Sequence, residues 1–134
     1  MQPAQSWASI PHTTTQHDAI QRPTSVTYAD ASVESFSYSG FNTTLIDQNS
    51  HKKVQQVDDF GRLVKVEEYT GSSTYTLYAT TNYTYDERDL LKQVQDAASN
   101  LTTINYDGYG RKTDMTDPDM GRSEERRVGK ECRL

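Results

Sequence analysis

The chain has 134 residues, of which 33% are hydrophobic, and it carries a formal net charge of -5 with a mean hydropathy of -0.89. It is therefore more polar than an ordinary compact domain, whose apolar share is about 45–50%. The negative charge provides no basic surface for nucleic acid or an anionic membrane. No apolar stretch is long enough for a transmembrane helix, and a lone cysteine excludes a disulfide framework. Nine tyrosines and many threonines favour β-strands over disorder.

The N-terminal part of the chain contains only weak structural signals. Residues 1–14 form a polar, irregular segment. The segment His17–Pro23 then keeps an Asp and an Arg, Asp18 and Arg22, and the segment Phe36–Ser39 keeps a pair of aromatic residues. We interpret both segments as degenerate copies of a turn pattern that is clearer further along the chain.

Three clear copies of this pattern lie between residues 52 and 116. An aromatic or apolar residue and an Asp are followed by two variable residues, then by Gly or Asp. Asp binds its own downstream backbone and Gly accepts a positive φ, so this order of residues indicates a turn. Between the turns the pattern alternates with period 2, with Tyr83 and Tyr85 on one face and Thr84 on the other. We therefore predict antiparallel strands over residues 52–116. The predicted turns are Asp58–Gly61, Asp86–Asp89, Asp96–Asn100 and Asp107–Gly110.

The turn signals form an internal repeat. The first set lies at positions 18, 39, 58, 86 and 107, and the step from 58 to 86 is longer because an insertion surrounds Gly71. A second set of acidic residues lies about halfway between them, and several of its members begin turns of their own: Asp30, Asp47, Glu68, Asp96 and Asp117. Each unit of about 20 residues is thus two strands and two turns. Turns at this spacing predict an all-β, tandem strand-turn-strand array.

The last residues, 122–134, differ from the rest in composition. Residues 1–121 carry sixteen acidic and nine basic residues, whereas residues 122–133 carry three acidic and five basic ones. The run Arg122–Arg133, which includes Cys132, is similar to the translation of a common short-read sequencing adapter. We therefore interpret residues 122–134 as an assembly artefact and expect Ser123–Leu134 to pack on nothing; the alternative is a basic surface-binding segment.

The repeat resembles the YD-repeat, or Rhs-repeat, family over residues 15–121. The family signature is Tyr-Asp, two variable residues and Gly-Arg, followed by a half-repeat with an Asp turn. Tyr106–Arg111 matches in full, Asp96–Thr102 resembles the half-repeat, and Asp117–Gly121 resembles a variant of it. Asp89 stands where the signature has Gly, so its turn either tolerates a side chain or has another geometry. The residues that carry the motif are Asp58, Gly61, Arg62, Tyr85, Asp86, Asp96, Tyr106, Asp107, Gly110 and Arg111.

The resemblance implies a structural function. In bacterial Rhs proteins, in the B and C components of insecticidal toxin complexes and in teneurins, such repeats spiral into a hollow β-shell, which in the bacterial members encloses a C-terminal toxin. The chain is then part of a larger shell that encapsulates and helps to deliver an effector absent from this sequence. Its expected partners are the remaining repeats and the toxin domain of the full-length protein. The expected location is secreted or associated with the cell envelope, although residues 1–10 carry no signal peptide. The alternative is a surface module for carbohydrate binding or adhesion.

No residue pattern points to catalysis or a cofactor. Repeated Tyr-Asp pairs indicate architecture, because catalysis needs one arrangement and a repeat scaffold needs many alike. The three histidines are far apart in the sequence and have no cysteine partners. Asp114, Asp117 and Asp119 lack the Gly and Glu spacing of an EF-hand loop and are interpreted as a solvated acidic turn. We expect no catalytic residue, no metal or other cofactor and no nucleic-acid partner.

Overall fold

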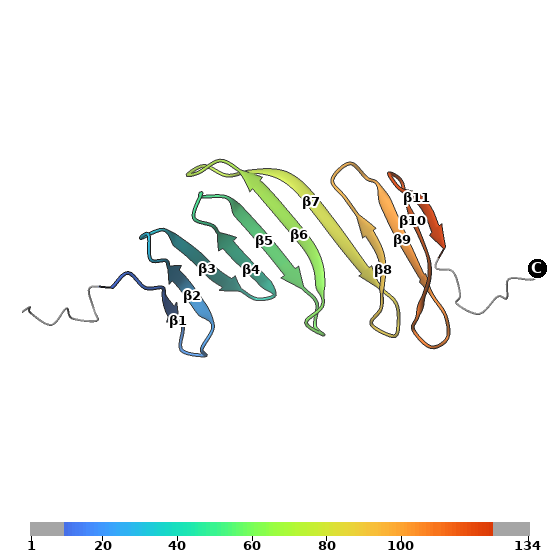
Figure 1. The fold of residues 1–134 in the computed structure, drawn as a ribbon, viewed down its shortest axis with the longest axis horizontal. Coiled ribbons are helices and arrows are strands. Elements are labelled where there is room, and N and C mark those ends of the chain that lie inside the picture. The colour runs from blue at the N-terminus through green and yellow to red at the C-terminus, as the bar shows by residue number, and fades with distance from the viewer. Residues whose placement is uncertain (1–9, 125–134) are drawn as a thin grey trace, which may run out of the picture.

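The structure, a computed structural model, describes residues 10–124 as a single antiparallel sheet of eleven strands (Figure 1). Each strand pairs with the next one along the chain, so the strand order in the sheet is the order in the sequence. This confirms the predicted all-β array. The strands are β1 (Thr14–His17), β2 (Pro23–Thr27), β3 (Val33–Ser39), β4 (Asn42–Ile46), β5 (Lys52–Val57), β6 (Leu63–Thr70), β7 (Thr76–Tyr85), β8 (Leu91–Gln95), β9 (Leu101–Tyr106), β10 (Lys112–Asp117) and β11 (Gly121–Glu124).

The strand register gives the sheet two faces of different polarity. One face, here called the apolar face, carries aromatic and aliphatic cross-strand pairs: Phe36 beside Leu45, Tyr83 beside Val94 and Ile104 beside Met115. The opposite face carries pairs such as Ser37 beside Thr44, Asn42 beside Gln56 and Lys65 beside Asn82. The alternation predicted around Tyr83 is therefore present.

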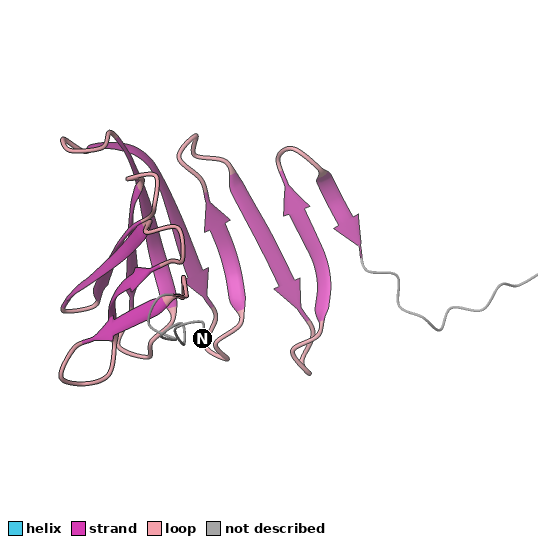
Figure 2. Cartoon of the chain, turned by 60° about the vertical axis from the view of Figure 1, so that its left-hand side comes forward, coloured by secondary structure: helices cyan, strands magenta, loops and turns pink. Residues whose placement is uncertain are grey.

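The sheet has almost no buried core. Among residues 10–124 only Val66, in the middle of β6, is buried, with 9% of its surface exposed. In this part of the chain no helix is long and apolar enough to cross a membrane. Figure 2 shows that the strands near the N-terminus turn out of the plane of β8–β11, as the twist of a β-sheet requires. The molecule is thus a single twisted layer.

The β6–β7 hairpin interrupts the regular repeat. Its strands, with 8 and 10 residues, are the longest of the described strands, and their connection extends beyond the neighbouring turns (Figure 1). The insertion predicted around Gly71 lengthens this hairpin. Glu68 consequently lies inside β6, and the reversal comes after Thr70. Gly71 has a φ of 106°, and a Cβ there would collide with the carbonyl oxygen of Thr74.

The C-terminal end of the sheet corrects one expectation from the sequence. Ser123 and Glu124 pair with Met115 and Asp114 in β10, so the prediction that Ser123–Leu134 pack on nothing is wrong for these two residues. A β-ladder forms through backbone groups and does not need a particular side chain, which is why composition did not reveal β11. Residues 1–9 and 125–134, with Cys132, lie outside the described part.

Candidate functional site: the aspartate turns

Seven of the ten connections between the described strands share one backbone geometry, here called the aspartate turn. The N–H of the first residue donates to the carbonyl of the fifth, and the N–H of the fourth donates to the carbonyl of the first, at 2.9–3.1 Å. The fourth residue has a φ between 63° and 79°. This is a hairpin with a type I turn and a bulge, in which the fourth residue is left-handed. The seven turns span residues 18–22, 28–32, 47–51, 58–62, 86–90, 96–100 and 107–111.

The Asp at the first position binds the backbone of its own turn. In the 107–111 turn, Asp107 Oδ1 accepts hydrogen bonds from the backbone N–H of Tyr109 at 2.9 Å and of Arg111 at 3.0 Å. Its Oδ2 accepts from Arg111 Nε at 2.8 Å. The backbone N–H of Arg111, and then its guanidinium, hold the pKa of Asp107 below its ordinary value. The carboxylate thus serves as an internal clamp.

The same clamp recurs in the other aspartate turns. Six of the seven begin with Asp, and in each of these Oδ1 accepts from the N–H of the third and fifth residues. The exception is the 28–32 turn. There Asp30, at the third position, accepts from the backbone N–H of Ser32 at 3.0 Å and from its hydroxyl at 2.6 Å.

The fourth position adopts the left-handed conformation with or without glycine. Gly61 and Gly110 have φ values of 79° and 78°, and Asp89 has 63°. Of the two possibilities left open for the Asp89 turn, the structure shows that it keeps the common geometry and tolerates a side chain. The Asp89 carboxylate lies 2.5 Å from Nη1 of Arg62, in the preceding turn on the same edge. A link to the neighbouring turn thus accompanies the strained residue.

The Tyr of each Tyr-Asp pair connects one repeat to the previous one. Tyr85 donates its hydroxyl hydrogen bond to the carbonyl of Leu63 at 2.8 Å, and Tyr106 donates to Leu91 at the same distance. In the degenerate N-terminal copy, Tyr38 donates to the carbonyl of Pro23 at 2.9 Å. All three acceptors lie shortly after the preceding turn on the same edge. The Tyr therefore couples repeats, while the Asp shapes a single turn.

Arg62 has the most contacts among the predicted motif residues. Its Nη2 lies 2.7 Å from Asp58 Oδ2, its Nη1 pairs with Asp89, and its guanidinium lies 5.0 Å from the centre of the Tyr85 ring. Arg111 makes the equivalent bond to Asp107, but its side chain is 72% exposed. Arg62 thus joins the 58–62 turn to the 86–90 turn. A hydrogen bond that the sequence did not reveal joins the 86–90 turn to the 107–111 turn: Arg88 Nη1 donates to the carbonyl of Asp107 at 2.7 Å.

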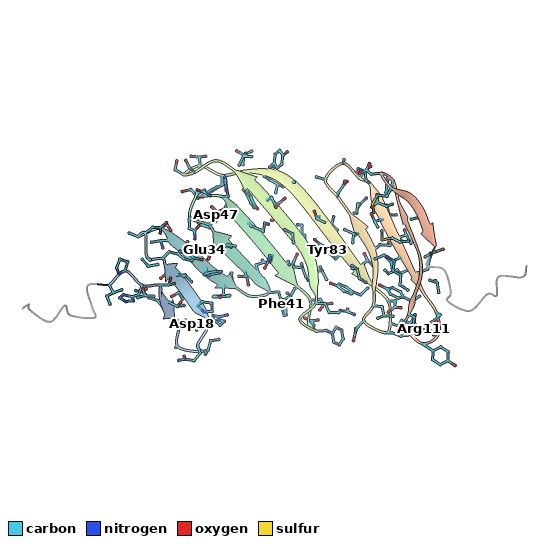
Figure 3. All side chains as sticks on the ribbon, in the orientation of Figure 1. Asp18, Glu34, Phe41, Asp47, Tyr83 and Arg111 are labelled. Carbon is cyan, nitrogen blue, oxygen red and sulfur yellow. The ribbon has the colours of Figure 1, made fainter. Side chains whose placement is uncertain are left out.

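The predicted motif residues divide between the two edges of the sheet. Figure 3 places Asp18, Phe41 and Arg111 along one edge, and Asp47 near the other. Seven of the ten motif residues belong to turns on the Arg111 edge, and Tyr85 and Tyr106 end the strands that lead into two of these turns. Asp96 forms its turn on the Asp47 edge. Within residues 10–124 no three His, Cys, Asp or Glu side chains are placed to hold a metal ion. The arrangement is a row of repeated structural links.

Comparison with known proteins identifies the fold. No protein-family model and no curated protein matches the chain. The crystal structure of TcdB2-TccC3 matches 82% of the chain with a TM-score of 0.70 and 19% sequence identity. The sheet therefore shares the fold of part of that structure. The TcdB2-TccC3 structure without its hypervariable C-terminal region gives a TM-score of 0.56 at 16% identity, and the Photorhabdus luminescens Tc holotoxin pore gives 0.54 at 15%, each over 78% of the chain.

These matches concern a small part of much larger molecules. The chain spans 6% of the TcdB2-TccC3 chain in the first match and 7% in the other two. At identities below 20% the similarity establishes the strand arrangement. The turn residues described above provide the physical basis of that arrangement in this sequence.

Proposed function

We propose that this chain is part of the wall of a hollow β-shell that encloses a toxin or effector and helps to deliver it. The observation that carries the proposal is the match of 82% of the chain to part of the TcdB2-TccC3 structure, at a TM-score of 0.70. The repeated tyrosine bonds support it, because Tyr38, Tyr85 and Tyr106 each join a repeat to the previous one in the same way.

The packing of the sheet fits a wall better than an independent domain. Val66, the one buried residue in the described part of the chain, cannot supply the core of a free-standing globule. In repeat proteins each unit is stabilised mainly by its neighbours, so a longer array stabilises every member. The apolar face, with half-buried residues such as Phe36 and Ile104, is suited to line or support a closed wall.

The motif residues would then act as structural links, with no catalytic role. The aspartate carboxylates are already occupied by hydrogen bonds of their own turns, as at Asp107. The partners would be further repeats and an enclosed toxin domain of the full-length protein. Such a shell would act outside the cell or at its envelope.

Recovery of the uninterrupted gene, followed by limited proteolysis of its full-length product, tests the proposal. We expect more repeats of this type and a C-terminal domain that resists protease until the shell is opened with denaturant. A product that ends in a membrane anchor or lectin-like domain, or a terminal domain digested as quickly as the free domain, would refute an enclosing shell.

A further inference from the structure

Large hydrophobic side chains are exposed at regular intervals along the Arg111 edge of the sheet. They have 54–88% of their surface exposed and are Ile20, Phe41, Phe60 and Tyr109. Three of them occupy the third position of an aspartate turn, and Phe41 lies in the short connection between β3 and β4. The fourth aspartate turn on this edge has Arg88 at its third position. These five residues are here called the turn row.

The third turn position differs between the two edges of the sheet. The three aspartate turns on the Asp47 edge have Asp30, Asn49 and Ala98 there. The backbone geometry is the same on both edges, so it does not demand an apolar residue, and turns ordinarily favour small polar ones. A large apolar residue that recurs at this position on one edge alone therefore indicates a contact surface.

The five members of the turn row are evenly spaced along the sheet. Consecutive members are two strands apart, because the row follows the connections β1–β2, β3–β4, β5–β6, β7–β8 and β9–β10. With strands about 4.8 Å apart, each step is about 10 Å and the row spans about 40 Å. A two-fold axis through Phe60, normal to the sheet, therefore brings the row of a second copy against it in reversed order.

The reversed order gives every member of the turn row a suitable partner. Phe60 meets its own copy, and Ile20 meets Tyr109. Phe41 meets Arg88, and a guanidinium is attracted to the face of an aromatic ring. In the unreversed order two Arg88 side chains would meet, and like charges repel. Aromatic and arginine side chains are also the residues enriched at the centres of protein interfaces.

We propose that the turn row binds a second copy of this chain, in reversed order about a two-fold axis through Phe60. The Asp47 edge is a poorer partner, because the β6–β7 hairpin extends beyond its other turns and interrupts a straight line of contact (Figure 1). With three aromatic side chains from each copy, the contact buries on the order of 1,000 Å², the lower limit for a specific interface. The pairing uses only described residues, so it can fail without the shell proposal failing.

Charge weakens this pairing. The four aspartate turns of the Arg111 edge carry seven acidic and four basic residues. Two such edges repel each other, and salt screens this repulsion without removing the apolar contact. Salt should therefore strengthen the dimer, whereas it would weaken an assembly held by ion pairs.

Sedimentation equilibrium of the full chain tests the proposal. We expect a monomer–dimer equilibrium with a dissociation constant on the order of 100 μM, which falls as NaCl is raised from about 0.05 M to about 0.5 M. Phe60→Ser should raise this constant about tenfold or more, whereas Phe60→Leu, which keeps an apolar side chain, should stay within about threefold of the parent. Tyr78→Ser is the matched control, because Tyr78 is 74% exposed and lies outside the turn row. Its dissociation constant should equal that of the parent.

Disulfide formation identifies the edge and the order of the contact. The chain has one cysteine, so Cys132→Ser provides a background without a native thiol. In that background Phe60→Cys should link two chains about tenfold faster than Ala98→Cys, which has the same turn position on the Asp47 edge. In a mixture, Ile20→Cys and Tyr109→Cys should link to each other faster than either links to itself.

Three results would overturn the proposal. The first is a chain that stays monomeric at millimolar concentration. The second is association that Phe60→Ser leaves unchanged or that Tyr78→Ser weakens equally, since it would then come from the strand edges or from exposed rings in general. The third is disulfide formation that is as fast for Ala98→Cys as for Phe60→Cys.

Discussion

At the scale of the residue, the fourth position of the aspartate turn requires a left-handed φ, which glycine adopts most easily, yet most of these turns have another residue there. Five of the seven turns place a residue other than glycine there, at φ values of 63–67°. The left-handed conformation costs an L-residue about 1–2 kcal/mol. The hydrogen bonds of the Asp and the pairing of the flanking strands must offset this cost. The turn therefore depends on its Asp, which is the first residue in six turns and the third in the 28–32 turn, and on the ladder, and glycine only relieves strain.

The 28–32 turn allows a direct test, because it has alanine at both its second and fourth positions. Ala31 has a φ of 66°, so Ala31→Gly should stabilise the turn by about 0.5–1 kcal/mol, since the relief of strain exceeds the added chain entropy. Ala29 does not have a positive φ, so Ala29→Gly should destabilise the turn by about 0.4–1 kcal/mol. Hydrogen exchange of the Tyr28 amide, which donates to Ser32, measures both changes locally. Equal effects of the two variants would contradict the strain argument.

Gly110→Ala is the reciprocal experiment. An added Cβ at Gly110 would lie 3.5 Å from Leu90 Cδ1, an ordinary contact, so the backbone conformation alone should decide the outcome. We expect a loss of about 0.5–1 kcal/mol in the opening free energy of the Asp107 amide, equal and opposite to the gain at Ala31. No change in the exchange of that amide would show that this turn does not enforce its φ.

The turn carboxylates should make the sheet sensitive to strong acid only. Hydrogen bonds to backbone N–H groups are the leading cause that holds the pKa values of Asp18, Asp86 and Asp107 below their ordinary value. A carboxyl whose folded pKa is depressed contributes stability above its unfolded pKa of about 3.9 and loses it as the pH falls through the folded value. Amide protection should therefore be constant from about pH 7 to about pH 5 and decline below about pH 4.

The Asp107→Asn variant separates this effect from general acid unfolding. An amide oxygen can still accept hydrogen bonds from the Tyr109 and Arg111 backbones, but it does not titrate. In this variant the opening free energy of the 107–111 turn should be lower at neutral pH and should fall less steeply as the pH is lowered. The 86–90 turn should keep the pH dependence that it has in the parent protein. An unaltered acid profile at the 107–111 turn would show that Asp107 is not the group that titrates.

At the scale of the element, the tyrosine hydroxyls lock successive repeats together. Tyr106→Phe removes the 2.8 Å hydrogen bond to the Leu91 carbonyl and should cost about 1 kcal/mol in the opening free energy of β8 and β9. Tyr83 is the control, because it lies on the same face and its hydroxyl has no hydrogen-bond partner among residues 10–124. Tyr83→Phe should change protection little, and a loss equal to that of Tyr106→Phe would assign the effect to the rings.

The sequence predicted the strands and turns but not the long-range bonds between them. Period-2 alternation and Asp-centred turns are local signals, so the strands over residues 52–116 and their turns were predictable. The bonds from Tyr85 to Leu63 and from Arg62 to Asp89 join residues 22 and 27 positions apart, and nothing local indicates them. The turn that starts at Tyr28 was also hard to place, because its Asp occupies the third position. These contacts depend on how the strands are aligned with one another in the sheet, which the composition of the chain does not indicate.

At the scale of the whole molecule, stability depends on neighbouring strands. Every strand pairing joins strands that are consecutive in sequence, and no second layer covers either face of the described sheet. Such a protein resembles a one-dimensional array, in which each strand is held by its two neighbours and the end strands by one. The described strands at the two ends, β1 and β11, each leave one side of their backbone unpaired in the sheet.

The isolated chain should therefore unfold gradually and associate through its edges. We expect a broad urea transition in which the amides of β1 and β2 lose protection before those of β5 and β6, because Val66 lies in the middle of the sheet. Free strand edges pair readily with other chains, so light scattering should show mass that rises with concentration. Thr15→Lys places a charge on β1 opposite Val26 and should reduce this association. Thr81→Lys is the control for added charge, because Thr81 lies on the interior strand β7, opposite Val66. It should weaken the sheet but should not lower the mass seen by light scattering, since it leaves the free edges unchanged. A sharp transition in a strictly monomeric protein would mean that the sheet stabilises itself as an independent domain, and a wall fragment would then be a poor description of it.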